Sequence, residues 1–215
     1  MSAPLIDLTN VSVRRGTALI LNGVSIRIES GTVVSLKGAN GSGKSTLLRV
    51  LATLLSPNAG DGSILGAAIG TTEVRSIRSL IGLVGHETAL RRGLTLRENL
   101  ALVTRLSSDP NGAEAALGRV GLFGAADRLV EHCSNGMLRR ADLARLFVTE
   151  PRIALLDEPS VGLDEAASHL VDDLIAQVVA GGGVVVVTSH GDERSIGPNP
   201  RRLTLDNGSI IEGRP

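Results

Sequence analysis

The stretch that decides the fold is Gly38 to Thr46, which reads Gly-Ala-Asn-Gly-Ser-Gly-Lys-Ser-Thr. It fits the pattern G-x-x-x-x-G-K-[ST], with Gly38, Gly43, Lys44 and Ser45 at the fixed positions. Glycines allow the backbone N–H groups of such a loop to turn toward phosphate oxygens, and the lysine adds a full positive charge. The stretch therefore predicts a phosphate-binding loop. The predicted nucleotide contacts are Gly38, Ala39, Asn40, Gly41, Ser42, Gly43, Lys44, Ser45 and Thr46.

The segments on either side of the loop support this interpretation. The apolar run at residues 33–36 is typical of a buried strand, and apolar residues recur at helical spacing over residues 47–55. A helix that starts near Lys44 directs its positive end at the phosphates, and Ser45 is predicted to offer its hydroxyl to phosphate-bound Mg²⁺. Strand, loop and helix together predict a site for a nucleoside triphosphate with Mg²⁺.

The composition argues against several classes of function. The 215 residues include 22 basic and 22 acidic side chains, so no net positive field attracts nucleic acid, and we expect no nucleic-acid partner. Cys133 is the sole cysteine, which excludes an internal disulfide and suits a reducing cytoplasm. From its N-terminal residues we expect no secretory leader, and the longest apolar run, Val184 to Val187, is too short to cross a bilayer. We expect a cytoplasmic protein that reaches a membrane only through another chain.

The order of the segments predicts one α/β domain over residues 1–215. Short alternating segments over residues 5–28, interrupted at Arg15-Gly16 and Asn22-Gly23, predict an N-terminal antiparallel sheet. Strands of a buried parallel core are predicted at residues 32–37, 153–156 and 184–187.

A small helical lobe is predicted to be inserted into this core at residues 88–135. Thr95 and Glu98 have the spacing of a capping box, which marks the start of a helix over residues 96–106. Further helices are predicted at residues 113–120, 137–149 and 165–179. The predicted fold is a P-loop NTPase core, a mixed sheet with an antiparallel β subdomain, plus the inserted helical lobe.

Two acidic residues and a histidine follow the predicted core strands. Asp157 and Glu158 come directly after the apolar run at residues 153–156, and His190 follows the strand at residues 184–187. The carboxyl ends of parallel strands lie beside the nucleotide loop in such sheets. Asp157 is predicted to hold Mg²⁺, Glu158 to polarise the water that attacks the γ-phosphate, and His190 to orient that water. The predicted catalytic residues are Lys44, Glu158 and His190.

The whole series of motifs strongly resembles the ATP-binding-cassette ATPases. It comprises Gly38 to Thr46, then Cys133-Ser134-Asn135-Gly136-Met137, Leu155-Leu156-Asp157-Glu158-Pro159, Ser160 to Asp164, and Ser189-His190. The resemblance implies that two cassettes form a head-to-tail homodimer on ATP, or that this chain pairs with another cassette. Ser134 and Gly136 would then contact the partner's γ-phosphate, and Asp164 would cross the interface. It also implies a membrane permease that docks on residues 88–105.

Three positions depart from the family pattern. The signature Leu-Ser-Gly-Gly-Gln is replaced by residues 133–137, which keep the serine and the second glycine. His86 stands where a glutamine is usual, and it is predicted to bind the nucleotide, to ligate Mg²⁺ or to orient water. Arg15 stands where an aromatic ring often stacks on adenine, and a guanidinium plane can stack on a purine. A solvated arginine in a turn is the alternative.

Within the family, three segments resemble the ATPase of cytochrome c maturation haem exporters. These are Gly85 to Leu90, Leu94 to Leu100, and the Ser134-x-Gly136-Met137 signature. The predicted function is ATP hydrolysis that powers a membrane permease, here for haem export. The alternatives are another exporter, a cassette that binds ATP as a switch but hydrolyses it poorly, and a soluble cassette acting in DNA repair or translation. The paired cassettes, coiled coils and basic patches usual in that last class are absent from the sequence.

Overall fold

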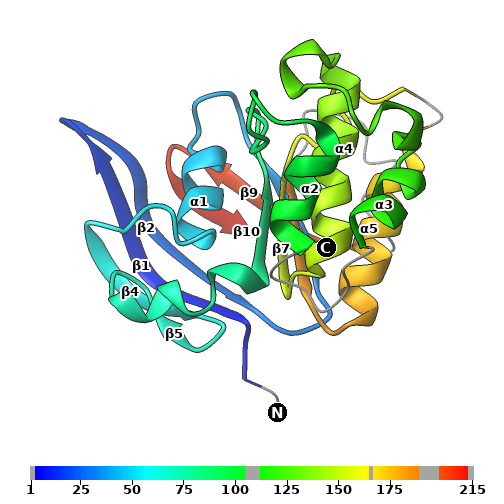
Figure 1. The fold of residues 1–215 in the computed structure, drawn as a ribbon. Helices are drawn as coiled ribbons and strands as arrows, with labels where there is room; N and C mark the ends of the chain where they lie inside the picture. Colours follow the sequence, from blue (N-terminus) through cyan, green and yellow to red (C-terminus); the bar gives the residue numbers. More distant parts are fainter. Residues whose placement is uncertain (1–2, 105–111, 165–166, 189–198, 213–215) are drawn as a thin grey trace.

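The computed structural model describes residues 3–104, 112–164, 167–188 and 199–212. Two sheets and a group of helices make up the fold (Figure 1). The larger sheet has six strands, in the spatial order β10 (Ser209–Glu212), β9 (Arg201–Asp206), β3 (Val33–Lys37), β8 (Val184–Thr188), β7 (Ile153–Asp157) and β6 (Ile81–Val84). All neighbouring strands pair in parallel except β9 and β10, which form an antiparallel hairpin. The predicted parallel core is confirmed.

The central strands β7 and β8 are buried on both faces, as their unbroken apolar runs predict. Because successive side chains of a strand point to opposite faces, the sheet separates two apolar clusters. Ala154 and Leu156 pack with the helices on one face, while Ile153 and Leu155 pack with β1, β2 and α1 (Lys44–Leu51) on the other. The strand that ends in Asp157 is therefore held from both sides.

The N-terminal part forms an antiparallel sheet, as predicted. Its strands lie in the order β2 (Ala18–Ile28), β1 (Ile6–Arg15), β4 (Ala59–Ile64) and β5 (Ala67–Ala68). Helix α1 lies between this sheet and the six-stranded sheet (Figure 1), and its buried side chains belong to the same apolar cluster as those of β1 and β2. The phosphate loop at the start of α1 is therefore anchored by both sheets.

The predicted turn at Asn22-Gly23 is wrong, because β2 continues through it to Ile28. Gly23 adopts φ +62°, and its N–H donates to the Ser12 hydroxyl at 3.0 Å. The pairing register of β1 and β2 shifts at this point. The glycine therefore accommodates an irregularity within one long strand, and the turn between the strands lies at Gly16 alone.

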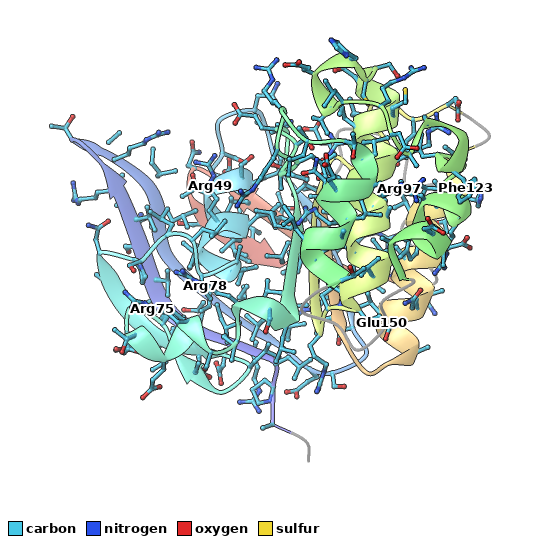
Figure 2. The ribbon with its side chains drawn as sticks, in the orientation of Figure 1. Arg49, Arg75, Arg78, Arg97, Phe123 and Glu150 are labelled. Atoms are coloured by element: carbon cyan, nitrogen blue, oxygen red, sulfur yellow. The ribbon has the colours of Figure 1, made fainter. Side chains whose placement is uncertain are left out.

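The helical part contains α2 (Leu96–Thr104), α3 (Gly112–Arg119), α4 (Asn135–Thr149) and α5 (His169–Ala180), with short 3₁₀ helices at η1 (Thr72–Arg75), η2 (Arg78–Leu80), η3 (Phe123–Ala125) and η4 (Val130–His132). The predicted capping box is confirmed: the Glu98 N–H donates to the Thr95 hydroxyl at 3.1 Å, and the Thr95 N–H donates to the Glu98 carboxylate at 2.8 Å. The Glu98 carboxylate accepts hydrogen bonds from the Thr95 N–H and the Thr95 hydroxyl, and these two bonds lower the pKa of the Glu98 carboxyl. Arg97 (Figure 2) forms ion pairs with Glu114 of α3 and with Asp127. These two ion pairs connect α2 to α3 and to the segment that contains Asp127.

Helices α2 and α3 come from the segment predicted as an inserted lobe, and α4 packs with both in one apolar cluster. The bounds of 88–135 stay a prediction. Within the described ranges, no helix has both the length and the apolar composition that crossing a membrane requires.

Candidate active site

The phosphate loop connects β3 to α1. Its two fixed glycines, Gly38 and Gly43, have no room for a side chain and adopt backbone angles that other residues disfavour. A Cβ on Gly38 would lie 2.3 Å from the Leu205 carbonyl oxygen, and one on Gly43 would lie 2.9 Å from the Ile20 carbonyl oxygen. Gly43 also adopts φ +106°, a backbone conformation that side chains disfavour. The loop therefore packs directly on the backbones of β2 and β9, and larger residues do not fit at either position.

The start of α1 is built to receive an anion. Gly43 is the residue before the helix and offers no side-chain cap, so the first N–H groups of the helix need an acceptor from outside. Lys44 is only 7% exposed, and its ammonium donates to the carbonyl oxygens of Gly38 at 2.7 Å and Ala39 at 3.1 Å. Backbone donors, the helix dipole and a buried cation therefore converge on the loop, which is the chemistry that phosphates bind.

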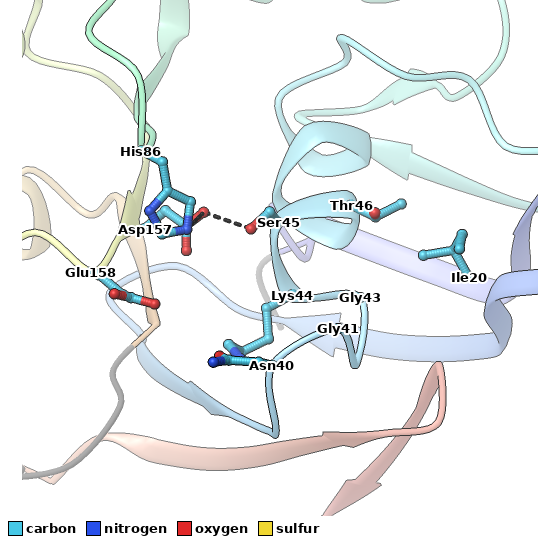
Figure 3. Close-up of a pocket in the computed structure, with 10 residues that line it drawn as sticks. All are labelled: Ile20, Asn40, Gly41, Gly43, Lys44, Ser45, Thr46, His86, Asp157 and Glu158. Atoms are coloured by element: carbon cyan, nitrogen blue, oxygen red, sulfur yellow. Dashed lines mark hydrogen bonds and ion pairs between the residues drawn. The ribbon is translucent and has the colours of Figure 1, made fainter. Parts of the chain in front are cut away.

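The carboxylate of Asp157 lies next to the loop at the carboxyl end of β7. The Ser45 hydroxyl donates to Asp157 Oδ2 at 2.8 Å, and the Thr188 hydroxyl at the end of β8 donates to Oδ1 at 2.6 Å. Figure 3 shows the Ser45 bond as a dashed line across the site. Ser45 and Asp157 are 112 residues apart in the sequence, and parallel pairing of the strands brings them together.

Glu158 follows Asp157 in a constrained backbone conformation. Its φ is +50°, which is uncommon for a residue other than glycine. Its N–H donates to the Thr188 hydroxyl at 3.0 Å, which holds the turn in place. The side chain faces the same cavity as Lys44 (Figure 3). Backbone strain of this kind is typical of residues whose side chains are aimed at a reaction.

His86 lies in the loop after β6, and its imidazole lies next to the Asp157 carboxylate (Figure 3). Its Nε2 is 3.5 Å from Asp157 Oδ2, and the side chain is 59% exposed. Ligand atoms of His86, Asp157 and Glu158 lie within 4.8 Å of one another. Mg²⁺ prefers hard oxygen ligands, so the hydroxyl of Ser45 and the carboxylate of Asp157 fit this ion, whereas an imidazole suits softer metals. The position of His86 is therefore better suited to holding a water molecule than to ligating Mg²⁺ directly.

These groups surround one cavity of about 600 Å³. That volume is within the range of pockets that hold small molecules. The lining residues are Ile20, Asn40, Gly41, Gly43, Lys44, Ser45, Thr46, His86, Asp157 and Glu158. The structure thus brings together most of the predicted nucleotide, metal and catalytic residues. His190 lies outside the described residues, and its predicted role stays a prediction.

Six other residues predicted to bind the nucleotide, all with described positions, are not among those that line this cavity: Gly38, Ala39 and Ser42 of the phosphate loop itself, and Arg15, Ser134 and Gly136. Arg15 is exposed at the end of β1. Ser134 and Gly136 lie at the start of α4, where the exposed Ser134 accepts a hydrogen bond from the Met137 N–H at 3.3 Å. A Cβ on Gly136 would lie 2.9 Å from the Gly162 carbonyl oxygen, so the glycine permits close contact with the segment after Glu158. Ser134 and Gly136 therefore lie at a helix start, and neither lines the cavity of its own chain.

Sequence reasoning missed two residues of the site. Thr188 anchors both Asp157 and Glu158, and its signal was a single polar residue at the end of a four-valine strand. Ile20 lines the cavity near the loop, where Arg15 had been predicted to meet the base. Ile20 reaches the cavity because β2 runs as one long strand past the loop, and the mistaken prediction of a turn at Asn22-Gly23 did not foresee that strand.

The chain is similar to known proteins over most of its length. Residues 21–161 match the family described as ABC transporter. The Nod factor export ATP-binding protein I of Burkholderia orbicola is 35% identical, over 100% of this chain and 72% of that protein. The daunorubicin resistance ATP-binding protein DrrA3 of Streptomyces coeruleorubidus is 36% identical, over 98% and 68%. The cytochrome c biogenesis ATP-binding export protein CcmA of Gluconobacter oxydans is 37% identical, over 86% and 81%.

Solved structures show the same fold. A dimeric ATP-binding cassette in a post-hydrolysis state, bound to ADP and Pi, has a TM-score of 0.84 at 26% identity, over 98% of this chain and 99% of that one. A bacterial Atm1-family ABC exporter with ATP bound has a TM-score of 0.84 at 25% identity, over 99% of this chain and 38% of that one. Motifs, cavity and relatives agree: the chain belongs to the ABC transporter family, as an ATP-binding subunit with ATPase activity that uses ATP and Mg²⁺.

Proposed function

We propose that the chain hydrolyses ATP as a head-to-tail homodimer, with each ATP held between the phosphate loop of one copy and Ser134 and Gly136 of the other. The observation that carries this proposal is the separation of the two halves: the loop lines the cavity, whereas Ser134 is exposed at the start of α4 outside it. The start of α4 presents N–H groups and a positive dipole end suited to a phosphate. The dimeric state of a similar solved cassette, bound to ADP and Pi, supports the dimer in this proposal.

Five side chains of the cavity have a chemical task in this proposal. Lys44 and the loop N–H groups bind the phosphates, while Ser45 and Asp157 hold Mg²⁺. When bound, Mg²⁺ neutralises phosphate charge and orients the phosphate oxygens. Glu158 accepts the proton of the attacking water, and His86 holds that water against the site. His190 completes the set by the sequence prediction alone.

ATP-dependent dimerisation tests the composite site. The hydrolysis-deficient variant Glu158→Gln is expected to elute as a dimer with ATP and Mg²⁺ and as a monomer without them, measured by light scattering after size exclusion. Adding Ser134→Ala is expected to weaken the ATP-bound dimer, because a contact to the partner's phosphate is lost. Ser76→Ala provides the matched control, since Ser76 is an exposed serine that bonds only locally, to Glu73. An ATP-bound species that stays monomeric, or a dimer insensitive to Ser134→Ala, contradicts the arrangement.

We further propose that the cassette powers a membrane permease that exports haem for cytochrome c biogenesis, from the cytoplasmic face of the membrane. Two observations favour this branch: the segment from Gly85 to Leu90, and the share of each relative that is covered. This chain spans 81% of the cytochrome c biogenesis relative, against 72% and 68% of the Nod factor and daunorubicin relatives. A permease for another exported molecule is the alternative, since the identities are 37%, 35% and 36%.

Co-purification with membrane proteins separates these alternatives. The described part of the predicted docking segment, residues 88–104, carries the exposed Arg91 and Arg92. The chain is expected to retain its permease in mild detergent, and the double variant R91E/R92E is expected to lose it. Arg75→Glu is the control, because Arg75 lies on the antiparallel-sheet side (Figure 2). Haem retained with the captured permease supports the branch, and a permease of another export system overturns it.

A further inference from the structure

The loop that carries His86 is held by the helix that starts with the signature residues. Three side chains of α4, spaced three residues apart and so on one face of the helix, bond to the backbone of β6 and the loop after it. Arg139 donates to the Gly85 carbonyl oxygen at 2.8 Å. Arg145 donates to the Leu83 carbonyl oxygen at 3.0 Å. Between them, Asp142 accepts from the Ala89 N–H at 3.3 Å. The segment is therefore attached to α4 on both sides of His86.

Asp142 is the centre of this contact. The carboxylate is 2% exposed as a residue, forms an ion pair with Arg145 at 3.4 Å, and accepts a hydrogen bond from the Thr88 hydroxyl. Burial raises the pKa of the Asp142 carboxyl, while Arg145 and the Thr88 hydroxyl oppose that rise. Burying a carboxylate in the protein interior costs free energy unless its hydrogen-bond and charge partners are all in place. Arg145 is a partner from α4 itself, whereas Thr88 and Ala89 are partners from the loop, so the full set is present only when the loop lies against α4.

The contact between the loop and the helix combines apolar packing, in which Leu90 joins the buried cluster of α4, with a polar groove. His86, Thr88, Arg139 and Asp142 line this groove of about 860 Å³, which also reaches Gly162. In a close-packed interior, van der Waals contacts hold neighbouring segments in position. Across the groove, polar bonds connect the loop to the helix. Arg139 adds a second such bond, from its Nε to the Val161 carbonyl oxygen at 3.4 Å, in the segment after Glu158.

We propose that Asp142 is a positioning residue for ATP hydrolysis: it holds residues 85–89 on α4, and thereby sets the His86 imidazole against Asp157. Because Ser134 caps the start of α4, the same helix joins the signature half of the site to the His86 side of the cavity. This inference rests on the proposed role of the cavity in hydrolysis. Asp142 is not among the residues that line the cavity, so it acts through the loop.

The test measures the position of His86 directly. In a ¹H–¹³C spectrum of the histidine rings, the His86 signal is assigned by its absence in His86→Ala. Two variants weaken the contact: Asp142→Asn keeps the shape of the side chain but removes its charge, and Thr88→Val removes one hydroxyl without leaving a buried charge unpaired. Both are expected to shift the His86 signal. Glu150→Gln is the matched control on α4, because Glu150 bonds to Gln177 at the other end of the helix.

Kinetics give the second measurement. Thr88→Val and Asp142→Asn are expected to lower kcat about 10-fold with KM for ATP nearly unchanged, since a misplacement of about 1 Å can cost roughly 100-fold. In the His86→Ala background the same changes are expected to have little further effect, because the group that they position is gone. Melting temperatures show that each variant is folded.

Two results overturn the inference. One is a His86 signal that does not move in either folded variant, or that moves equally in Glu150→Gln. The other is an equal loss of kcat with and without the His86 side chain, which indicates general destabilisation. A wild-type protein with no Mg²⁺-dependent phosphate release contradicts the proposed function instead, and the spectrum still tests whether Asp142 positions His86.

Discussion

Glu158→Gln is expected to abolish steady-state ATP hydrolysis while leaving ATP binding intact. Its carboxylate faces the cavity from the turn after β7, and an amide of the same shape cannot accept the proton of the attacking water. Loss of a positioned general base lowers a rate by ~10²- to 10⁴-fold. Phosphate release measures the loss, and titration with a fluorescent ATP analogue measures binding, which is practical because the chain has no tryptophan or tyrosine.

The control for this variant is Glu29→Gln. Glu29 is an exposed carboxylate paired with Arg27 beside the antiparallel sheet, so the same chemical change there is expected to leave turnover unchanged. If Glu158→Gln retained turnover within a few-fold of the wild type while saturated with ATP, Glu158 would have no part in the chemical step. The cavity would then have to activate water through another group.

Lys44→Ala is expected to weaken ATP binding strongly. The ammonium is buried over the loop, 2.7 Å from one of its carbonyl oxygens. Among the described residues, no other lysine or arginine lines the cavity, so no side chain there replaces its charge. A hydrogen bond to a charged group contributes about 1.5–3 kcal/mol. The corresponding loss of affinity is roughly 10- to 100-fold, measured by the same titration.

The only other lysine provides a matched control. Lys37 is the last residue of β3, one position before the loop, and does not line the cavity. Lys37→Ala removes the same charge and is expected to bind ATP with nearly wild-type affinity. Equal losses in the two variants would show that net charge near the loop, and not the position of Lys44, governs binding.

The relation between sequence and structure differs from one part of the site to another. The phosphate loop was predictable because its glycines are required locally, by backbone conformation and by the close approach of Leu205 and Ile20. Asp157 was predictable because an unbroken apolar run signals a strand buried on both faces, whose end lies at the binding edge. The antiparallel sheet was predicted correctly, but Asn22-Gly23 was taken for a turn. The same dipeptide can serve a hairpin or an irregular strand, and pairing with β1 decides which.

The sequence by itself predicted the chemistry of the site: a phosphate loop, a carboxylate for Mg²⁺, a general base and a signature serine, all from short runs whose geometry depends on near neighbours. Only the tertiary structure decided how these groups are held. Thr188 binds Asp157 and Glu158 across two strands, and Asp142 binds the His86 loop from α4. Such contacts join residues that are 30 to 53 positions apart. No local pattern encodes them, because each partner is an ordinary polar residue until the sheet and helices bring the two together.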